Sequence, residues 1–299
     1  LLQQSFRLML GQLRPEDQVA IVTYAGSAGL VLEPTAAKDS AKILSALNNL
    51  AAGGSTAGQE GLQQAYAVAR DMAADGEVTR VLLATDGDFN VGISDPEALE
   101  DYIAGERKSG TYLSVLGFGR GNLDDATMQA LAQHGNGTAA YIDTLSEAQK
   151  VLVDQLTGAL FPIADDVKIQ MEFNPAVIAE YRLIGYETRA LNREDFNNDR
   201  VDAGEIGAGT SVTALYEVTP VGSPALRTDP LRYENAEAAA EAAPAPSAAS
   251  GELGFLKLRY KEPGASSSQL IELPVTPEPG EADTDTRFAV AVAGFGQLL

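Results

Sequence analysis

The stretch VTRVLLATDGD, residues 78–88, decides the fold. Its first part is mostly apolar, which is typical of a strand buried on both faces of a parallel sheet. Acidic residues follow at once, so they stand at the carboxyl end of that strand. Open parallel sheets bind their ligands along this edge. The stretch therefore indicates both the class of fold and the place where a binding site is expected.

The same strand pattern recurs on either side of this stretch. It is found at residues 18–25 and 112–117, and more weakly at 139–142. Apolar residues at helical spacing fill the segments around these strands. Helices are accordingly expected at residues 2–13, 41–50, 58–73, 96–108, 126–134 and 146–160. Strands that alternate with helices predict an α/β domain, here residues 1–162, whose open, mostly parallel sheet carries helices on both faces.

After Pro162 the pattern changes to strands without helices between them. Short alternating or apolar segments occur at residues 167–173, 181–186, 211–218, 253–260 and 269–273. They predict a β-rich domain over residues 163–299. A run rich in Ala, Glu, Pro and Ser predicts a disordered insertion near residues 227–250. A helical pattern returns at residues 287–299.

Charge and composition exclude several classes of function. The sequence has 42 acidic and 21 basic residues, a formal net charge of −21, which repels a nucleic-acid backbone and an anionic membrane surface. It contains no Cys, which excludes disulfides, thiolate metal sites and a cysteine nucleophile. No apolar stretch is long enough to span a membrane. An acidic surface suits divalent cations and basic protein patches, although it also serves solubility in general.

Two loops at the expected edge carry oxygen ligands. Ser55 and Thr56 follow a Gly-Gly pair and precede a predicted helix, and Asp86 and Asp88 follow the strand quoted above. Hydroxyl and carboxylate oxygens from separate loops form the kind of site that Mg²⁺ or Ca²⁺ prefers. Structural interpretations stand beside this one. Thr56 can cap the helix, Asp86 can belong to an Asp-Gly turn, and Asp88 can be solvated.

A resemblance to a known family makes the site more specific. The runs QVAIVTYA at 18–25, GGST at 53–56 and LATDGD at 83–88 resemble the second half of the metal-ion-dependent adhesion site of von Willebrand factor type A domains. Residues 202–217 and the terminal FGQLL resemble the β-rich region that follows this domain in a bacterial branch of the family.

The resemblance implies a ligand set and a function. Thr56 is then the hydroxyl ligand and Asp86 the carboxylate ligand of Mg²⁺, or of Ca²⁺ or Mn²⁺, with Ser55 and Asp88 as further candidates. The implied function is a non-enzymatic protein-binding or adhesion module, whose partner protein offers an acidic residue to the ion. The resemblance also implies an extracytoplasmic location, in the periplasm or at the cell surface.

One family motif has no counterpart in this sequence. The family's first strand ends in Asp-x-Ser-x-Ser, which supplies most of the direct ligands, and it precedes a helix that matches residues 2–13. In the family this strand lies between those that match residues 18–25 and 78–85. We therefore expect the sequence to be part of a longer protein, with two interior strand edges left unpaired and with weakened metal binding.

Two other functions remain open. The run LLATDGD at residues 82–88 also resembles the Asp-x-Asp motif of haloacid dehalogenase-type phosphatases. That motif normally lies on the first strand of its fold, whereas at least one strand and two helices are predicted before it here. The third possibility is a structural domain with a vestigial metal site.

A second acidic segment and the single histidine also need an interpretation. The segment from Asp195 to Glu205 resembles a calcium loop, but Arg200 stands where such loops need Gly and Ile206 where they need an acid. A polar hairpin loop is therefore preferred to a calcium site. His134 lies where a helix is expected to end, so it is interpreted as a partner of the helix dipole.

Overall fold

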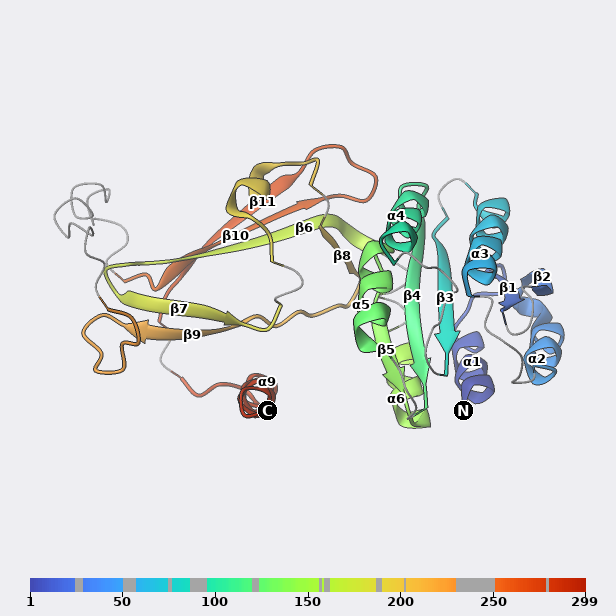
Figure 1. Ribbon diagram of the computed structural model, residues 1–299, viewed down its shortest axis with the longest axis horizontal. Coiled ribbons are helices and arrows are strands. Elements are labelled where there is room, and N and C mark those ends of the chain that lie inside the picture. Colours follow the sequence, from blue (N-terminus) through green and yellow to red (C-terminus); the bar gives the residue numbers. More distant parts are fainter. Residues whose placement is uncertain are drawn as a thin grey trace. The chain divides into compact units, whose positions relative to one another are not determined.

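A computed structural model describes most of the chain (Figure 1). The described residues are 1–24, 29–50, 58–74, 77–86, 96–119, 124–155, 158, 162–186, 190–201, 203–229, 251–277 and 280–299. They form two compact units. The first unit contains Leu1–Ile163 and Gly204–Thr210, and the second contains Ala164–Ala203 and Ser211–Leu299.

The first unit is built on a parallel sheet. Its strands are β3 (Thr79–Thr85), β4 (Thr111–Phe118) and β5 (Ala139–Ile142), with β4 in the middle. Both ladders are parallel. Nearly every residue of β4 is buried, as expected of a strand that is covered on both faces. The predicted parallel α/β sheet is confirmed.

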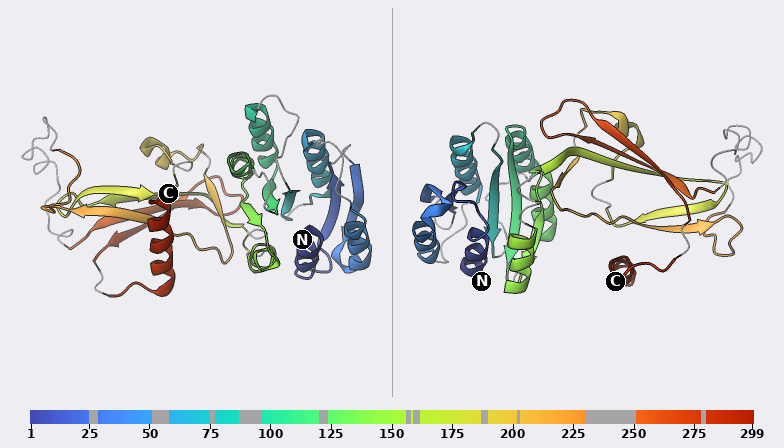
Figure 2. Two further views of the ribbon diagram at one scale, coloured as in Figure 1. Left: turned by 60° about the horizontal axis from the view of Figure 1, so that its bottom comes forward. Right: turned by 180° about the vertical axis from the view of Figure 1, so that it is seen from behind.

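Two layers of helices cover this sheet (Figure 2). One layer is α3 (Gly58–Met72), α4 (Pro96–Arg107) and α5 (Asp125–His134). Its side chains pack with Leu113 and Val115 of β4. The other layer is α1 (Leu2–Leu10) and α6 (Leu145–Gln149), which continues into the π-helical turn η2 (Lys150–Asp154). This layer packs with Leu116 and Phe118, on the opposite side of the same strand.

A second, two-stranded sheet completes the first unit. Strand β1 (Gln18–Thr23) pairs antiparallel with β2 (Gly29–Ala36), which the sequence pattern did not predict. A short 3₁₀ turn, η1 (Ala37–Asp39), leads into α2 (Ser40–Asn48), which packs with β1, β2 and α1 through a third apolar cluster. Within the described residues β1 pairs with β2 alone and β3 with β4 alone, so each keeps the unpaired interior edge that is expected for residues 18–25 and 78–85.

The second unit is β-rich. Strands β6 (Pro162–Phe173), β10 (Gly254–Lys261) and β11 (Gln269–Val275) form antiparallel ladders with β10 in the middle. Strands β7 (Ile178–Ile184) and β9 (Leu215–Pro220) form a second antiparallel pair. The ring of Phe173 in β6 lies 4.6 Å from that of Tyr181 and 5.2 Å from that of Tyr216, so aromatic contacts join the two sheets. The predicted β-rich region is confirmed.

Three further elements lie in the second half of the chain. The 3₁₀ helix η4 (Arg193–Asn197) and helix α9 (Thr284–Gly296) belong to the second unit, and β8 (Gly204–Gly207) belongs to the first. No helix among the described residues combines the length and the apolar content that crossing a bilayer requires.

The predicted insertion falls mainly outside the described residues. The chain entering it is described as far as residue 229. There the backbone N–H groups of Arg227 and Thr228 donate to the Glu180 carboxylate at 3.1 and 2.8 Å. The rest of the predicted insertion, residues 230–250, lies outside the described residues.

Packing against β4 predicts the effect of one substitution. A Cβ at Gly137, in the segment entering β5, would lie 1.8 Å from the backbone oxygen of Leu113, so the backbone must shift. Gly137→Ala is expected to lower the free energy of unfolding by about 1–3 kcal/mol. Urea denaturation measures it. Gly105→Ala in α4 is the control, since its Cβ would have no neighbour within 4 Å in the described part of the chain. This substitution should stabilise the helix by about 0.5–1 kcal/mol. Equal midpoints for the two variants would contradict the packing.

Candidate functional site

Asp86 lies at the carboxyl edge of the parallel sheet. It follows β3 directly, and its side chain is exposed. The preceding Thr85 is buried and stands opposite Gly117 near the end of β4. Asp86 thus lies where the sequence predicts a carboxylate, and its role as a metal ligand stays a prediction.

Tyr24 connects this edge to β1 and α3. Its hydroxyl donates to the backbone oxygen of Ala84 at 2.6 Å. Helix α3 approaches the same tyrosine through Gly61, where a Cβ would come within 2.4 Å of the Tyr24 Cβ. Burial raises the pKa of Tyr24, a hydrogen bond with Thr85 opposes this shift, and the negative charge of Asp86 adds to it. Tyr24 thus holds the start of α3 and the end of β3 at one edge.

The other predicted ligands lie outside the described residues. These are Ser55, Thr56 and Asp88. The helix that follows residues 53–56 is described from Gly58, and Tyr24 anchors it beside β3. In the part of the chain that is described, no group of three or more His, Asp or Glu residues is placed to hold a metal ion. The oxygen chemistry of the four candidates fits a hard cation, but the described residues supply only one of them.

A groove of about 1030 Å³ separates β1 from β3. Both strands line it along their whole length, together with residues of α1 and α3, and Asp86 lies among the lining residues. Most residues of β1 and β3 are only partly buried, although both strands have the sequence pattern of fully covered ones. In the described residues no ladder joins β1 to β3, so each presents an edge to the groove.

Other polar residues of the first unit have structural roles. His134 is the last residue of α5, as predicted, and its Nδ1 lies 2.8 Å from the backbone oxygen of Ala130. Asn136, in the left-handed conformation with φ of 51°, donates to Glu205 and accepts from Arg107. No local pattern predicts the contact of Asn136 with Glu205, because the two residues are 69 positions apart.

Together these features define an open α/β domain of the type that binds its ligand at the carboxyl edge of the sheet. A family model described as von Willebrand factor type A domain matches residues 3–155, and one described as Uncharacterized protein YfbK, C-terminal, matches residues 158–299. The chain belongs to the von Willebrand factor type A domain family.

Individual relatives agree with this assignment. The Uncharacterized protein YfbK of Escherichia coli (strain K12) is 47% identical over 299 residues, which are 100% of this chain and 51% of the relative. Uncharacterized protein sll0103 of Synechocystis sp. is 28% identical over 140 residues, 47% of this chain and 32% of that protein. The chain therefore spans about half the length of the YfbK relative, or less in the case of sll0103.

A solved structure shows the same fold. The von Willebrand factor type A protein from Catenulispora acidiphila aligns with a TM-score of 0.51 at 16% identity. The alignment covers 92% of this chain and 60% of that one. At this identity the likeness concerns the fold alone.

Two tyrosine substitutions test the connection made by Tyr24. Tyr24→Phe leaves the Ala84 carbonyl without this donor and is expected to cost about 1–2 kcal/mol of unfolding free energy. Tyr66→Phe in α3 is the matched control, because the buried Tyr66 hydroxyl has no hydrogen-bond partner among the described residues. Its loss is expected to be neutral or stabilising. Urea denaturation of both variants measures this. The reverse order of stability would show that the Tyr24 hydrogen bond does not hold the edge together.

The raised pKa of Tyr24 makes the free energy of unfolding depend on pH in the alkaline range. A tyrosine whose folded pKa lies above its unfolded value of about 10 contributes stability that is complete below pH 10. This contribution is lost as the pH rises toward the folded pKa. Tyr24→Phe is therefore expected to lose less stability than the parent above pH 10, measured by urea denaturation across that range. Parallel pH profiles would contradict the expectation.

Proposed function

We propose that this chain forms part of a non-enzymatic protein-binding module, whose partner binds through a divalent cation at the carboxyl edge of the β3–β4–β5 sheet. The position of Asp86 carries the proposal: it is an exposed carboxylate directly after β3, among the residues that line the groove. Family membership supports it, because von Willebrand factor type A domains are generally interaction modules.

The proposed ligands offer oxygen atoms only. Asp86 is the carboxylate ligand and Thr56 the hydroxyl ligand, with Ser55 and Asp88 as further candidates. Such a site suits Mg²⁺, or alternatively Ca²⁺ or Mn²⁺. Two ligands on separate loops give little advantage over water for an ion that requires near-octahedral geometry. Residues 1–299 by themselves are therefore expected to bind Mg²⁺ weakly.

The groove supports a second part of the proposal, a further strand of the protein between β1 and β3. This strand carries the Asp-x-Ser-x-Ser motif that residues 1–299 lack. Both flanking strands line the groove with apolar, partly buried side chains, and no ladder joins them in the described residues. Unpaired backbone groups on an interior edge are costly. The YfbK relative, about twice as long as this chain, has room for such a segment.

The proposed partner is a protein that offers an acidic side chain to the ion. With a formal net charge of −21, the surface of this chain repels carboxylates in general. A bound cation reverses the local charge and attracts one carboxylate at a defined place. An extracytoplasmic location, in the periplasm or at the cell surface, suits such adhesion and belongs to the same proposal.

The phosphatase alternative fits the fold less well. The Asp-x-Asp motif of haloacid dehalogenase-type enzymes normally ends the first strand, whereas β1 and β2 both precede β3 here. The family model that matches residues 3–155 is that of a von Willebrand factor type A domain. A structural domain with a vestigial site is the remaining alternative, and metal titration separates it from the proposal.

The test is calorimetric titration with Mg²⁺ of a protein in which residues 1–299 follow the proposed strand. Asp86→Ala is expected to weaken Mg²⁺ binding by about 10–100-fold or more, since it deletes a charged ligand. Thr56→Ala is expected to weaken metal-dependent partner binding while leaving the fold intact. The chain of residues 1–299 is expected to bind Mg²⁺ poorly.

Asp71→Ala provides the matched control for net charge. Asp71 is an exposed carboxylate in the last turn of α3, so its removal changes the net charge as Asp86→Ala does. Its Mg²⁺ affinity is expected to equal that of the parent. Tight Mg²⁺ binding by residues 1–299, or unaltered binding after Asp86→Ala, would place the ion elsewhere and refute the proposal.

A further inference from the structure

Strand β6 contains a bulge that turns an acidic side chain inward. In the β6–β10 ladder Arg259 faces Lys168 and Lys261 faces Asp165, so two residues of β6, one of them Asp166, oppose a single residue of β10. Asp166 has a φ of 55°, in the left-handed region that residues other than glycine rarely adopt. The Asp166 side chain is only 6% exposed. A strained backbone at a buried carboxylate persists only where its surroundings stabilise it.

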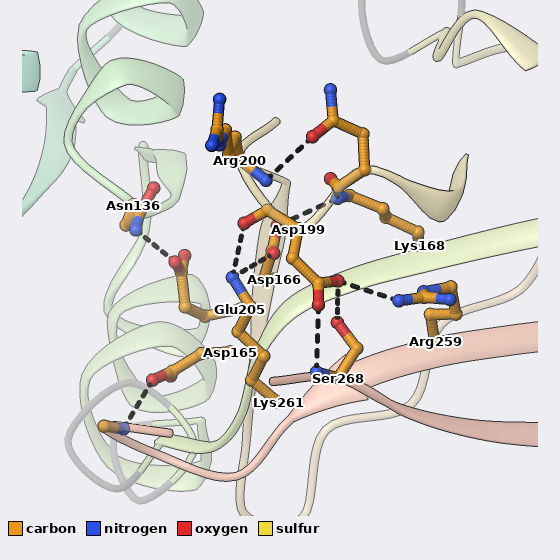
Figure 3. A network of polar contacts seen from close by, with 12 residues as sticks. Asn136, Asp165, Asp166, Lys168, Asp199, Arg200, Glu205, Arg259, Lys261 and Ser268 are labelled. Atoms are coloured by element: carbon orange, nitrogen blue, oxygen red, sulfur yellow. Dashed lines mark hydrogen bonds and ion pairs between the residues drawn. The ribbon is translucent and has the colours of Figure 1, made fainter. Parts of the chain in front are cut away.

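Two lysines stabilise Asp166. The Nζ of Lys261 lies 2.7 Å from Asp166 Oδ2, and the Nζ of Lys168 lies 3.6 Å from Oδ1 (Figure 3). Both ammonium groups are largely or fully buried, with side chains 15% and 1% exposed. A buried charge of this kind requires an opposite charge, because neither water nor an apolar neighbour compensates it.

The same two ammonium groups bind the acidic segment after η4. Lys168 Nζ donates to the backbone oxygen of Asn198 at 2.6 Å, and Lys261 Nζ donates to that of Asp199 at 2.8 Å. Phe196 of η4, in the same segment, is also buried. The lysines therefore link the bulge of β6 to this segment.

The side chains of Asn197 and Asp199 in this segment are also hydrogen-bonded. Arg259 donates to Asn197 Oδ1 at 3.2 Å and to Asp199 Oδ1 at 2.8 Å, and Ser268 donates to the same carboxylate. The hydrogen bond from Ser268, followed by that from Arg259, holds the pKa of Asp199 well below its ordinary value. Asn197 and Asp199 stand at two of the alternating positions whose oxygen atoms a calcium loop would use as ligands.

The charges of the cluster balance without a metal. Ion pairs join Asp166 to Lys168 and Lys261, and Asp199 to Arg259. Asp165, which faces Lys261 across the ladder, is the third carboxylate beside these three cations. A divalent ion would add two positive charges to a neutral, partly buried cluster, and the resident ammonium groups would repel it.

We propose that residues 193–201 form a metal-free clasp, in which Lys168, Lys261 and Arg259 supply the positive charge that calcium supplies in loops of similar composition. The clasp holds this segment against β6 and β10 at any concentration of divalent cations. It is independent of the function proposed for the edge at Asp86, and it accounts for an acidic segment that resembles a calcium loop but lacks its Gly and its terminal acid.

The first arm of the test measures calcium dependence. The full chain carries Asp86→Ala, so that the candidate edge site does not contribute, and its thermal midpoint is recorded in EDTA and in millimolar CaCl₂. The two midpoints are expected to agree. A rise in CaCl₂ that Asp199→Asn abolishes would show that the segment binds calcium, and it would overturn the proposal without affecting that for Asp86.

The second arm removes charges of the clasp in the same background. Asp166→Asn keeps the size of the side chain and tolerates the left-handed backbone, and Lys261→Met keeps much of the chain length. Each is expected to lower the thermal midpoint by roughly 5–10 °C, because a buried charge loses its partner. Lys257→Met is the control, since it removes a lysine from the same strand without breaking a clasp contact.

A local measurement makes the outcome specific. Amide hydrogen exchange of residues 193–201 is expected to accelerate in Asp166→Asn and Lys261→Met but not in Lys257→Met. Ser268→Ala, which removes one hydrogen bond to Asp199, gives a milder variant if the others do not fold. Unchanged exchange in this segment for all clasp variants would refute the clasp.

Discussion

The parallel ladder between β3 and β4 is the constraint on which the first unit depends. It runs from Thr79 opposite Thr111 to Thr85 opposite Gly117. Because successive side chains of a strand point to opposite faces, this register decides which residues of β4 meet each helical layer. The same ladder ends where Asp86 begins, so the placement of the candidate ligand follows from the pairing of the core strands. The pairing of β3 with β4 therefore determines both the packing on the two faces of the sheet and the position of its carboxyl edge.

The sequence predicts best those elements whose signal is local. Strands β3 and β4 are recognisable because a strand covered on both faces is apolar along its length. Strand β2 was missed because its run contains Glu33 and Pro34, and because only Leu32 and Thr35 of its residues are buried. Its apolar run is limited to residues 30–32, so its pairing with β1 becomes visible only in three dimensions.

In the candidate site too, only residues with a local sequence signal could be predicted. Asp86 was predictable because it directly follows a strand with a strong signal. Tyr24 was not, since its hydrogen bond to Ala84 spans 60 positions. The acidic run near Asp199 resembled a calcium loop in the sequence, but Lys261, the residue that supplies a positive charge to its backbone, is 62 positions away. Acidic residues that resemble a metal loop are close together in the sequence, whereas the lysine or arginine that neutralises them can be far away in the sequence.

The proposed ion site beside Asp86 and the metal-free clasp differ in what their stability depends on. At the edge beside Asp86 the proposed ion is exchangeable, and the strand that would fill the groove would bring both backbone partners for β1 and β3 and most of the ligands. An ion that binds only the completed sheet stabilises it in proportion to the logarithm of its concentration, so folding and binding are linked there. In the clasp the cations are attached covalently through Lys168, Lys261 and Arg259, so that linkage is absent. A module whose partner binding depends on a divalent ion can therefore contain a β-rich unit whose stability does not depend on that ion.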